Sequence, residues 1–252
     1  MRVSSQPQPW ELSRMKICFI MGIMQRSGTN YIFKLLTRHP RCLGSGPIWE
    51  DFFIHHSDLL ETYVNLLYSK WNPKWNVSQT LGPPDKLLAN LGQSIAQFIK
   101  AQVPLYPEMQ KMKGDPDPLR HSLLITKTPS IRNIHNFCRL FPDQYMIIVV
   151  RDGRSVVESG VKSFGWNREK AIRTWTQAAG QIRQVLNSDL TRGKNILLLR
   201  YEDMVMDEPG QLQRIFSFLK INPEEYNFQG LADLKVYGSS ELTSSGGNVH
   251  WG

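Results

Sequence analysis

The sequence predicts an α/β fold with a central, mostly parallel β-sheet flanked by helices. Four short runs rich in Ile, Val and Leu lack the polar alternation of a half-exposed strand, as expected of central strands covered on both faces. Segments with helical periodicity lie between these runs, so strands and helices alternate through most of the chain. The length of 252 residues makes one large domain the simplest expectation.

The apolar runs define the expected strands, and the segments between them define the expected helices. The strands are expected at residues 16–21, 123–126, 145–150 and 195–200. The helices are expected at residues 29–38, 57–71, 86–103, 130–140, 168–186 and 210–220, with another from about Gly153. Ser130 fits an N-cap position, and Pro40 and Pro142 mark helix ends.

The chain divides into a short arm and one domain. The arm covers residues 1–14 and contains prolines, and the domain covers residues 15–252. Within the domain, residues 46–120 are rich in aromatic residues and prolines. We expect this segment to be a helical insertion over the carboxyl edge of the sheet, where open α/β sheets bind their ligands.

The chain is basic, which suits an anionic ligand or surface. Its formal net charge is +8 and its pI is near 9.4. The charge is dispersed over the sequence, without a long Lys/Arg run, so we do not expect nucleic acid as a partner. The three cysteines form no CxxC pair, which argues against a disulfide framework and a zinc site.

The sequence also lacks the marks of membrane insertion and export. No apolar stretch reaches the roughly 18 to 20 residues of a transmembrane helix, and no signal-peptide core precedes Met15. We therefore expect a cytoplasmic protein without an integral membrane segment. The sequence leaves its oligomeric state open.

The stretch MGIMQRSGTN, residues 21–30, has the form of a phosphate loop that lacks its lysine. A nucleotide-triphosphate loop reads G-x-x-x-x-G-K-[ST], in which the lysine reaches the outer phosphates and the hydroxyl holds magnesium. Here five residues separate Gly22 from Gly28, and Thr29-Asn30 stands where Lys-Ser/Thr is required. The sequence therefore disfavours a magnesium-triphosphate site.

The same loop retains what a compact anion needs. The backbone amides of residues 27–30 lie at the expected helix N-terminus, where the helix dipole favours negative charge. Ser27 and Thr29 add hydroxyl groups, and Arg26 adds one positive charge. The alternative is a polar turn between strand and helix that binds nothing.

A second stretch supports the anion-binding interpretation. The strand at residues 145–150 is followed by Arg151, and the next helix carries Ser159 about two turns along. Arg151 and Ser159 are therefore placed to bind a second phosphate together. The alternative is that Arg151 and Asp152 form a surface ion pair, worth under about 1 kcal/mol.

Both stretches resemble motifs of the sulfotransferase family. Residues 25–30 (QRSGTN) resemble its 5′-phosphosulfate loop, and residues 151–159 (RDGRSVVES) resemble its 3′-phosphate motif, including the Arg-to-Ser spacing. Residues 199–204 (LRYEDM) are similar to its R-Y-E-D segment. Residues 127–129 (KTP) look like the K-T-P of many bacterial and carbohydrate sulfotransferases.

The resemblance implies a sheet with the topology of P-loop nucleotide-triphosphate hydrolases. It also implies that the protein binds 3′-phosphoadenosine 5′-phosphosulfate without a metal. By the family's pattern, Arg26, Ser27, Gly28, Thr29 and Asn30 hold the phosphosulfate group. Arg151 and Ser159 hold the 3′-phosphate. Tyr201 lies near the nucleotide, or simply ends a strand.

The last residues resemble a late segment of the family. Residues 237–240 (YGSS) and 244–251 are similar to a Gly-Ser-Ser and a glycine-rich turn that returns over the 3′-phosphate, which implies a role for Ser239. We expect residues 237–252 to form this C-terminal loop. The sequence ends at Gly252, where relatives continue with a basic residue and a further helix, so truncation of this loop is left open. The alternative is a flexible tail.

The implied reaction moves a sulfuryl group from the donor to a hydroxyl or amine by in-line displacement, in which positioning and electrostatics carry most of the catalysis. Arg26 and Lys127 would neutralise the developing charge, although Lys127 alternatively only ends its strand. The general base is sought just after the loop, at Glu50, His55 or His56. We favour Glu50 because apolar neighbours strengthen a carboxylate as a base.

Other polar residues near this base are assigned structural roles. We expect Asp51 to be a helix cap, and His121 and His135 to be structural. The aromatic residues between Trp49 and Tyr106 are expected either to line a pocket for a small-molecule or lipid-like alcohol, or to belong to the core. Two competing functions remain, a small-molecule or nucleotide kinase and a non-catalytic anion-binding protein of the same fold.

Overall fold

The structure is a computed structural model that describes residues 14–45, 48–101, 120–191 and 193–231. Nearly all of the expected N-terminal arm, residues 1–14, lies outside the described residues, as do Ser239 and the expected C-terminal loop. No helix within the described ranges is long and apolar enough to cross a membrane.

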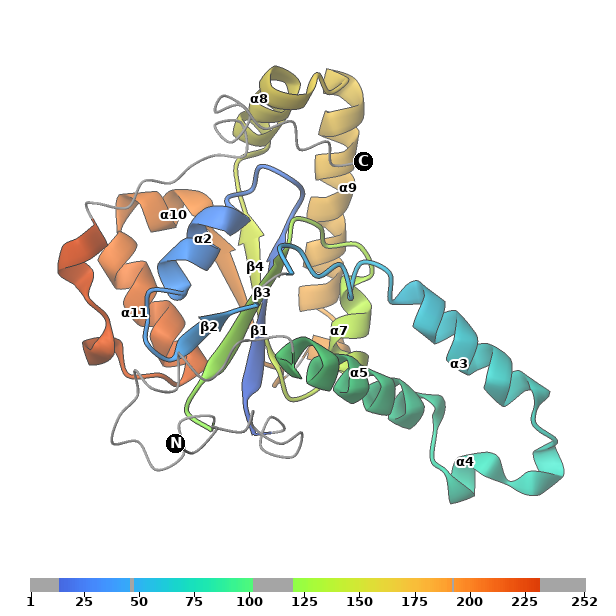
Figure 1. Cartoon of the computed structure of the whole chain (residues 1–252). Helices are drawn as coiled ribbons and strands as arrows, with labels where there is room; N and C mark the ends of the chain where they lie inside the picture. Colours follow the sequence, from blue (N-terminus) through green and yellow to red (C-terminus); the bar gives the residue numbers. More distant parts are fainter. Residues whose placement is uncertain (1–13, 46–47, 102–119, 192, 232–252) are drawn as a thin grey trace.

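The core of the protein is a five-stranded sheet flanked by helices (Figure 1). Its strands are β1 (Lys16–Gly22), β2 (Cys42–Gly44), β3 (Leu123–Thr128), β4 (Tyr145–Val150) and β5 (Ile196–Arg200). The strand order is β2-β3-β1-β4-β5, and every pairing is parallel. The predicted α/β fold with a parallel sheet of nucleotide-loop topology is therefore confirmed.

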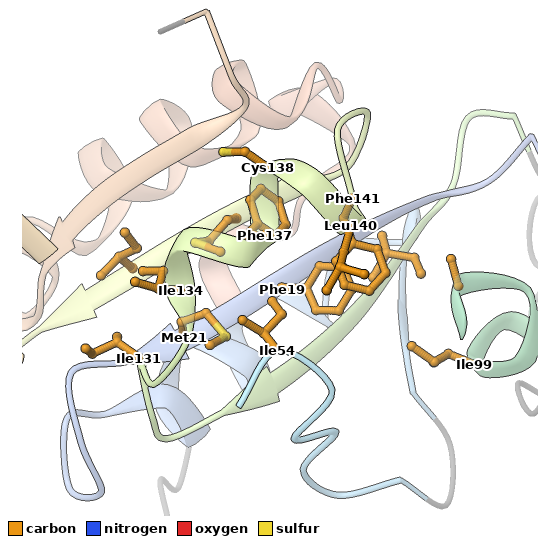
Figure 2. Close-up of a cluster of buried hydrophobic side chains, with 14 of the residues drawn as sticks. Phe19, Met21, Ile54, Ile99, Ile131, Ile134, Phe137, Cys138, Leu140 and Phe141 are labelled. Carbon is orange, nitrogen blue, oxygen red and sulfur yellow. The ribbon is translucent and has the colours of Figure 1, made fainter. Parts of the chain in front are cut away.

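Both faces of the three central strands, β1, β3 and β4, are buried, which explains why these strands lack polar alternation. Phe19 and Met21 of β1 belong to one hydrophobic cluster, and Cys18 and Ile20 belong to the other. Figure 2 shows the first cluster, in which the ring of Phe19 lies 4.7 Å from that of Phe141. Alternate residues of the central strand thus support opposite layers of helices.

The helices form one layer on each face of the sheet (Figure 1). One layer contains α2 (Thr29–Leu36), α10 (Tyr201–Met206) and α11 (Glu208–Leu219). The other contains α7 (Phe137–Leu140) and α9 (Arg168–Leu186). The helix α8 (Gly153–Phe164) begins where β4 ends, at the carboxyl edge of the sheet. This edge is where the predicted anion-binding loops lie.

The segment that was expected to be an insertion has two parts. Its first described residues, from Ile48 to Ser57, lie against the carboxyl end of β3. Its helices then reach away from the sheet as an arm (Figure 1). These helices are α3 (Asp58–Lys70), η1 (Pro73–Trp75), α4 (Val77–Thr80) and α5 (Pro84–Ala101). Arg139 of α7 holds the base of the arm through ion pairs with Glu61 and Asp85.

The predicted helix at residues 130–140 is wrong. Only a 3-10 turn, η2 (Ile134–Asn136), and the short α7 are helical there. The Ser130 hydroxyl accepts a hydrogen bond from the Arg132 N–H group, so it closes a turn instead of capping a helix. Asn133 then has a left-handed φ of 59°, so a continuous helix from residue 130 to α7 cannot form.

Candidate functional site

The loop that follows β1 is closed by its own serine. Ser27 is buried, and its hydroxyl accepts a hydrogen bond of 3.1 Å from the Met24 N–H group and donates one to the Met24 carbonyl. The Ile23 N–H group donates to the Val149 carbonyl of β4, which extends the strand pairing into the loop. The Ser27 side chain therefore shapes the loop just before the start of α2.

The start of α2 offers unused hydrogen-bond donors. Gly28 is the N-cap, and it supplies no side chain to the first turn. Within the described residues, the backbone N–H groups of residues 27–30 donate no hydrogen bond. The Asn30 side chain adds an acceptor, because its Oδ1 atom is buried without a partner in the same described ranges. Free amides at the positive end of a helix favour a bound anion.

Two residues of the loop have left-handed backbone conformations. The φ angle is 72° at Arg26 and 95° at Gly28. Glycine is required at the second position for a further reason, since a Cβ atom there would lie 2.3 Å from the Tyr201 ring. The strained backbone at Arg26 is consistent with a functional site, where strain is commonly stored.

The loop is joined to the predicted 3′-phosphate motif by hydrogen bonds. Arg26 Nε donates to the Ser159 hydroxyl at 2.8 Å, and Arg151 Nη1 donates to the Arg26 carbonyl at 3.1 Å. Burial and the charge of Arg151 lower the pKa of Arg26. Two guanidinium groups therefore lie close together, and an anion between them would relieve their repulsion.

Arg151 is held in place by its surroundings. Its guanidinium lies 4.4 Å from the centre of the Tyr201 ring, and its carbonyl accepts a hydrogen bond from the Trp175 indole. The alternative of an Arg151–Asp152 surface pair is wrong. Asp152 instead caps α8 and pairs with the Arg154 side chain at 3.0 Å. The alternative that Tyr201 simply ends a strand is wrong, because β5 ends at Arg200 and Tyr201 begins α10. Its ring lies against both Arg151 and the Gly28 position.

Lys127 and Glu50 meet at the carboxyl end of β3. Lys127 pairs in register with Ile20 of β1, so its strand ends beside the loop. Its side chain is 1% exposed, and Nζ lies 3.4 Å from Glu50 Oε1. Burial lowers the pKa of Lys127, and the charges of Glu50 and Asp51 oppose this effect. A buried amine beside a partly exposed carboxylate is a suitable arrangement for charge stabilisation and proton transfer.

Asp51 is not a helix cap, contrary to expectation. Ser57 precedes the first residue of α3, while Asp51 is buried with its carboxylate bonded to the Thr126 hydroxyl at 2.8 Å. Burial raises the pKa of Asp51 to about 6, although hydrogen bonds and the charge of Lys127 lower it. Sequence reasoning missed this role of Asp51 because the Thr126 partner is 75 positions away in the chain.

The two candidate histidines differ in their environments. His55 is half-buried, and its Nδ1 atom lies 2.7 Å from the Ser130 hydroxyl. Burial and the neighbouring charge on His56 and Arg132 lower its pKa, so its imidazole is neutral near pH 7. His56 is exposed, with its ring 4.6 Å from that of His55.

His55 faces an open hollow of 250 Å³ beside the loop. The other lining residues are Met24, Gln25, Phe52, Pro129, Ser130 and Trp166. Most of this wall is apolar, and two of its members directly precede Arg26. Among the aromatic residues of the expected insertion, Trp49, Tyr63 and Trp75 are at least 48% exposed, so they are not core residues.

A family model described as "Sulfotransferase family" matches residues 18–225. Among curated proteins, Protein-tyrosine sulfotransferase A of Caenorhabditis elegans is 28% identical over 214 residues, which are 81% of this chain and 49% of the relative. The chain thus spans about half the length of this relative.

Two solved structures are also similar, at low identity. The sulfotransferase domain from the curacin biosynthetic pathway is 16% identical over 93% of this chain and 79% of that one, with a TM-score of 0.46. Sulfotransferase STF1 of Mycobacterium tuberculosis H37Rv is 13% identical over 85% of this chain and 70% of that one, with a TM-score of 0.48.

Proposed function

The chain belongs to the sulfotransferase family, and we propose that it moves a sulfuryl group from 3′-phosphoadenosine 5′-phosphosulfate to a hydroxyl or amine acceptor. One observation carries this proposal. Arg26, Arg151 and Ser159 form a continuous hydrogen-bonded cluster beside the backbone amides of residues 27–30, which donate no hydrogen bond within the described part of the chain. This cluster suits a ligand with two separate anionic groups, which distinguishes the donor from ordinary nucleotides.

In this proposal the two anionic groups of the donor are bound by different residues. The amides of residues 27–30 and the guanidinium of Arg26 bind the 5′-phosphosulfate, while Arg151 and Ser159 bind the 3′-phosphate. Tyr201 lies between the residues for the phosphosulfate and those for the 3′-phosphate, since its ring packs on both Gly28 and Arg151. A role of Ser239 stays a prediction, because it lies outside the described residues. The single 5′-phosphate gives a triphosphate-binding metal no function, so we propose metal-free binding.

The chemical step in this proposal is an in-line displacement at sulfur. The acceptor oxygen or nitrogen forms a bond to sulfur as the bond from sulfur to the phosphate oxygen breaks, which releases adenosine 3′,5′-bisphosphate. Arg26 and Lys127 stabilise the negative charge that develops on the transferred group and on the leaving oxygen. Glu50 accepts the acceptor's proton, and its position next to Lys127 supports this role.

We propose a small-molecule or lipid-like alcohol as the acceptor. The hollow between Phe52 and Trp166 supports an acceptor with an apolar part, because its wall is mainly apolar. Similarity to a protein-tyrosine sulfotransferase adds a phenolic hydroxyl to the acceptors that should be screened.

Ligand binding tests the donor site without knowledge of the acceptor. Adenosine 3′,5′-bisphosphate should raise the midpoint of thermal unfolding, and magnesium-ATP should not. Arg151→Ala should lose this response, whereas Arg154→Ala should keep it, since Arg154 is 92% exposed and pairs only with Asp152 among the described residues. A response to magnesium-ATP alone would favour a kinase. No response to either ligand would contradict the proposed donor site.

Substitution of the candidate bases tests the proton acceptor. Glu50→Gln should lower turnover by about 10²- to 10⁴-fold and leave bisphosphate binding unchanged. His55→Gln and His56→Gln should each retain most turnover. Full activity of Glu50→Gln together with an inactive His55→Gln would transfer the role to His55, whose neutral imidazole faces the hollow.

A further inference from the structure

We propose that Asp51 is a positioning residue, whose buried carboxylate clamps the turn at residues 49–53 onto β3 and so holds Glu50 against Lys127. This inference rests on the proposed function, because it assigns meaning to the position of Glu50. Asp51 itself does not face the reacting atoms in this proposal. It acts through its neighbour in the chain and through the lysine of β3.

The clamp consists of hydrogen bonds from both the side chain and the backbone of Asp51. Its Oδ2 atom accepts from the Thr126 hydroxyl at 2.8 Å, and its Oδ1 atom accepts from the Phe53 N–H group at 3.0 Å. Its own N–H group donates to the Lys127 carbonyl at 3.1 Å. Both carboxylate oxygens are therefore used, as expected of a buried charge.

The turn needs such a clamp because its backbone is strained. Phe52 has a left-handed φ of 50°, which is unfavourable for a bulky residue. Its N–H group donates to the Thr128 hydroxyl at 3.0 Å. The contacts of this turn therefore fall on three successive residues of β3, with Lys127 in the middle. Strained conformations persist only where the surroundings hold them, and these contacts supply that constraint.

The geometry sets the position of Glu50. It directly precedes Asp51, so fixing the Asp51 backbone to the Lys127 carbonyl fixes the start of the Glu50 side chain relative to the same lysine. The Lys127 side chain then returns to Glu50 at 3.4 Å and passes 4.4 Å from the Trp49 ring. A small displacement of the turn would separate the proposed base from the proposed cation, and misplacement of about 1 Å is costly in catalysis.

The charge of Asp51 has a second effect. Of the β3 residues that face the Asp51 carboxylate, only Lys127 is charged, since Thr126 and Thr128 are neutral. Within its own turn, the neighbouring charged residue is Glu50. The Asp51 carboxylate favours the charged form of Lys127, whose pKa burial lowers. Because the pKa of Asp51 is about 6, the clamp gains its charge in the range where enzymes are commonly assayed.

Asp51→Asn tests the proposal, since an amide has the same shape without the charge. Turnover should fall about tenfold or more. The KM for the donor and the affinity for adenosine 3′,5′-bisphosphate should stay within about twofold. An inflection near pH 6 in the kcat profile of the wild type should also disappear. Asp143→Asn, at an exposed aspartate, is the matched control and should leave all of these quantities unchanged.

A second measurement does not depend on turnover. In NMR titrations of the Lys127 side chain, Asp51→Asn should lower the apparent pKa of the amine, because a nearby negative charge is removed. If Asp51→Asn does not fold, Thr126→Val removes the hydroxyl donor and should move the pH inflection upward.

Unchanged kcat, pH profile and Lys127 titration in a variant that binds the bisphosphate would overturn the clamp. A wild type that fails to bind the bisphosphate would overturn the proposed function, and the Lys127 titration would still decide whether Asp51 acts on the lysine.

Discussion

Arg26 and Ser159 are joined by a hydrogen bond of 2.8 Å although 133 positions separate them. The loop and the helix that carry them meet because β1 and β4 are adjacent parallel strands, with Gly22 opposite Val149. The carboxyl ends of both strands therefore lie at the same edge of the sheet. The expected phosphosulfate loop and the expected 3′-phosphate motif thus form one cationic site.

The two arginines of this site are expected to have different effects. Arg26→Ala should lower turnover by about 10²- to 10³-fold, because Arg26 lies beside the transferred group in the proposed site. Arg151→Ala should mainly weaken binding of adenosine 3′,5′-bisphosphate, by about 10- to 100-fold, since it removes a charge-assisted hydrogen bond to a remote phosphate. Steady-state kinetics and calorimetry measure both quantities. Equal effects of both substitutions on turnover and on binding would contradict this division.

Gly28 should not tolerate a side chain. A Cβ atom there would lie 2.3 Å from the Tyr201 ring, so Gly28→Ala should displace that ring and weaken bisphosphate binding by about tenfold or more. Gly165→Ala is the matched control, because Gly165 also has a positive φ but no atom of the described residues lies within 4 Å of a Cβ built there. It should cost about 1 kcal/mol of stability and leave binding unchanged. Equal binding by both variants would show that the ring contact is unimportant.

Two helical glycines should respond in opposite directions to alanine. A Cβ at Gly92 of α5 would lie 1.9 Å from the Leu140 carbonyl oxygen, so Gly92→Ala should lower the free energy of unfolding by about 1 to 3 kcal/mol. Among the residues that the structure describes, a Cβ at Gly180 of α9 would have no atom within 4 Å. Gly180→Ala should therefore raise stability by about 0.5 to 1 kcal/mol. Urea unfolding measures both, and a stable Gly92→Ala variant would show that the arm does not pack tightly on α7.

Asp51 should make stability depend on pH. Its folded-state pKa of about 6 lies above the ordinary value of 3.8, so its contribution to stability is fully present below the ordinary value and is lost as the pH rises through 6. The full effect is roughly 3 kcal/mol. From pH 8 to pH 5, the wild type should gain about 1 kcal/mol in unfolding free energy relative to Asp51→Asn. Parallel pH curves in urea unfolding would refute the raised pKa.

Local sequence patterns predicted most of the sheet but not its shortest strand. β4 is an uninterrupted apolar run, so its boundaries follow from residues that are adjacent in the chain. β3 begins as an apolar run but continues through Lys127 and Thr128, two residues beyond its expected end. β2 has only three residues, Cys42–Gly44, which is too short for a periodic signal. Its pairing with β3 provides the partner that makes it a strand.

The wrong helix at residues 130–140 has a tertiary cause. Ser130 bonds to His55, and the Asn133 side chain donates to the His55 carbonyl and to Asp58. These partners are at least 75 positions away, so helical periodicity could not report them. Contacts with the distant turn override the local preference for a helix.

The sequence by itself determined the parallel sheet and the residues of the two predicted anion-binding motifs, because apolar patterns and loop motifs depend on residues that are neighbours in the chain. Only the tertiary structure decided that Arg26 bonds to Ser159, that Lys127 meets Glu50 and that Asp51 is buried behind them. Burial and charge pairing depend on which strands become neighbours, and they change pKa values through desolvation and nearby charges that no single segment contains.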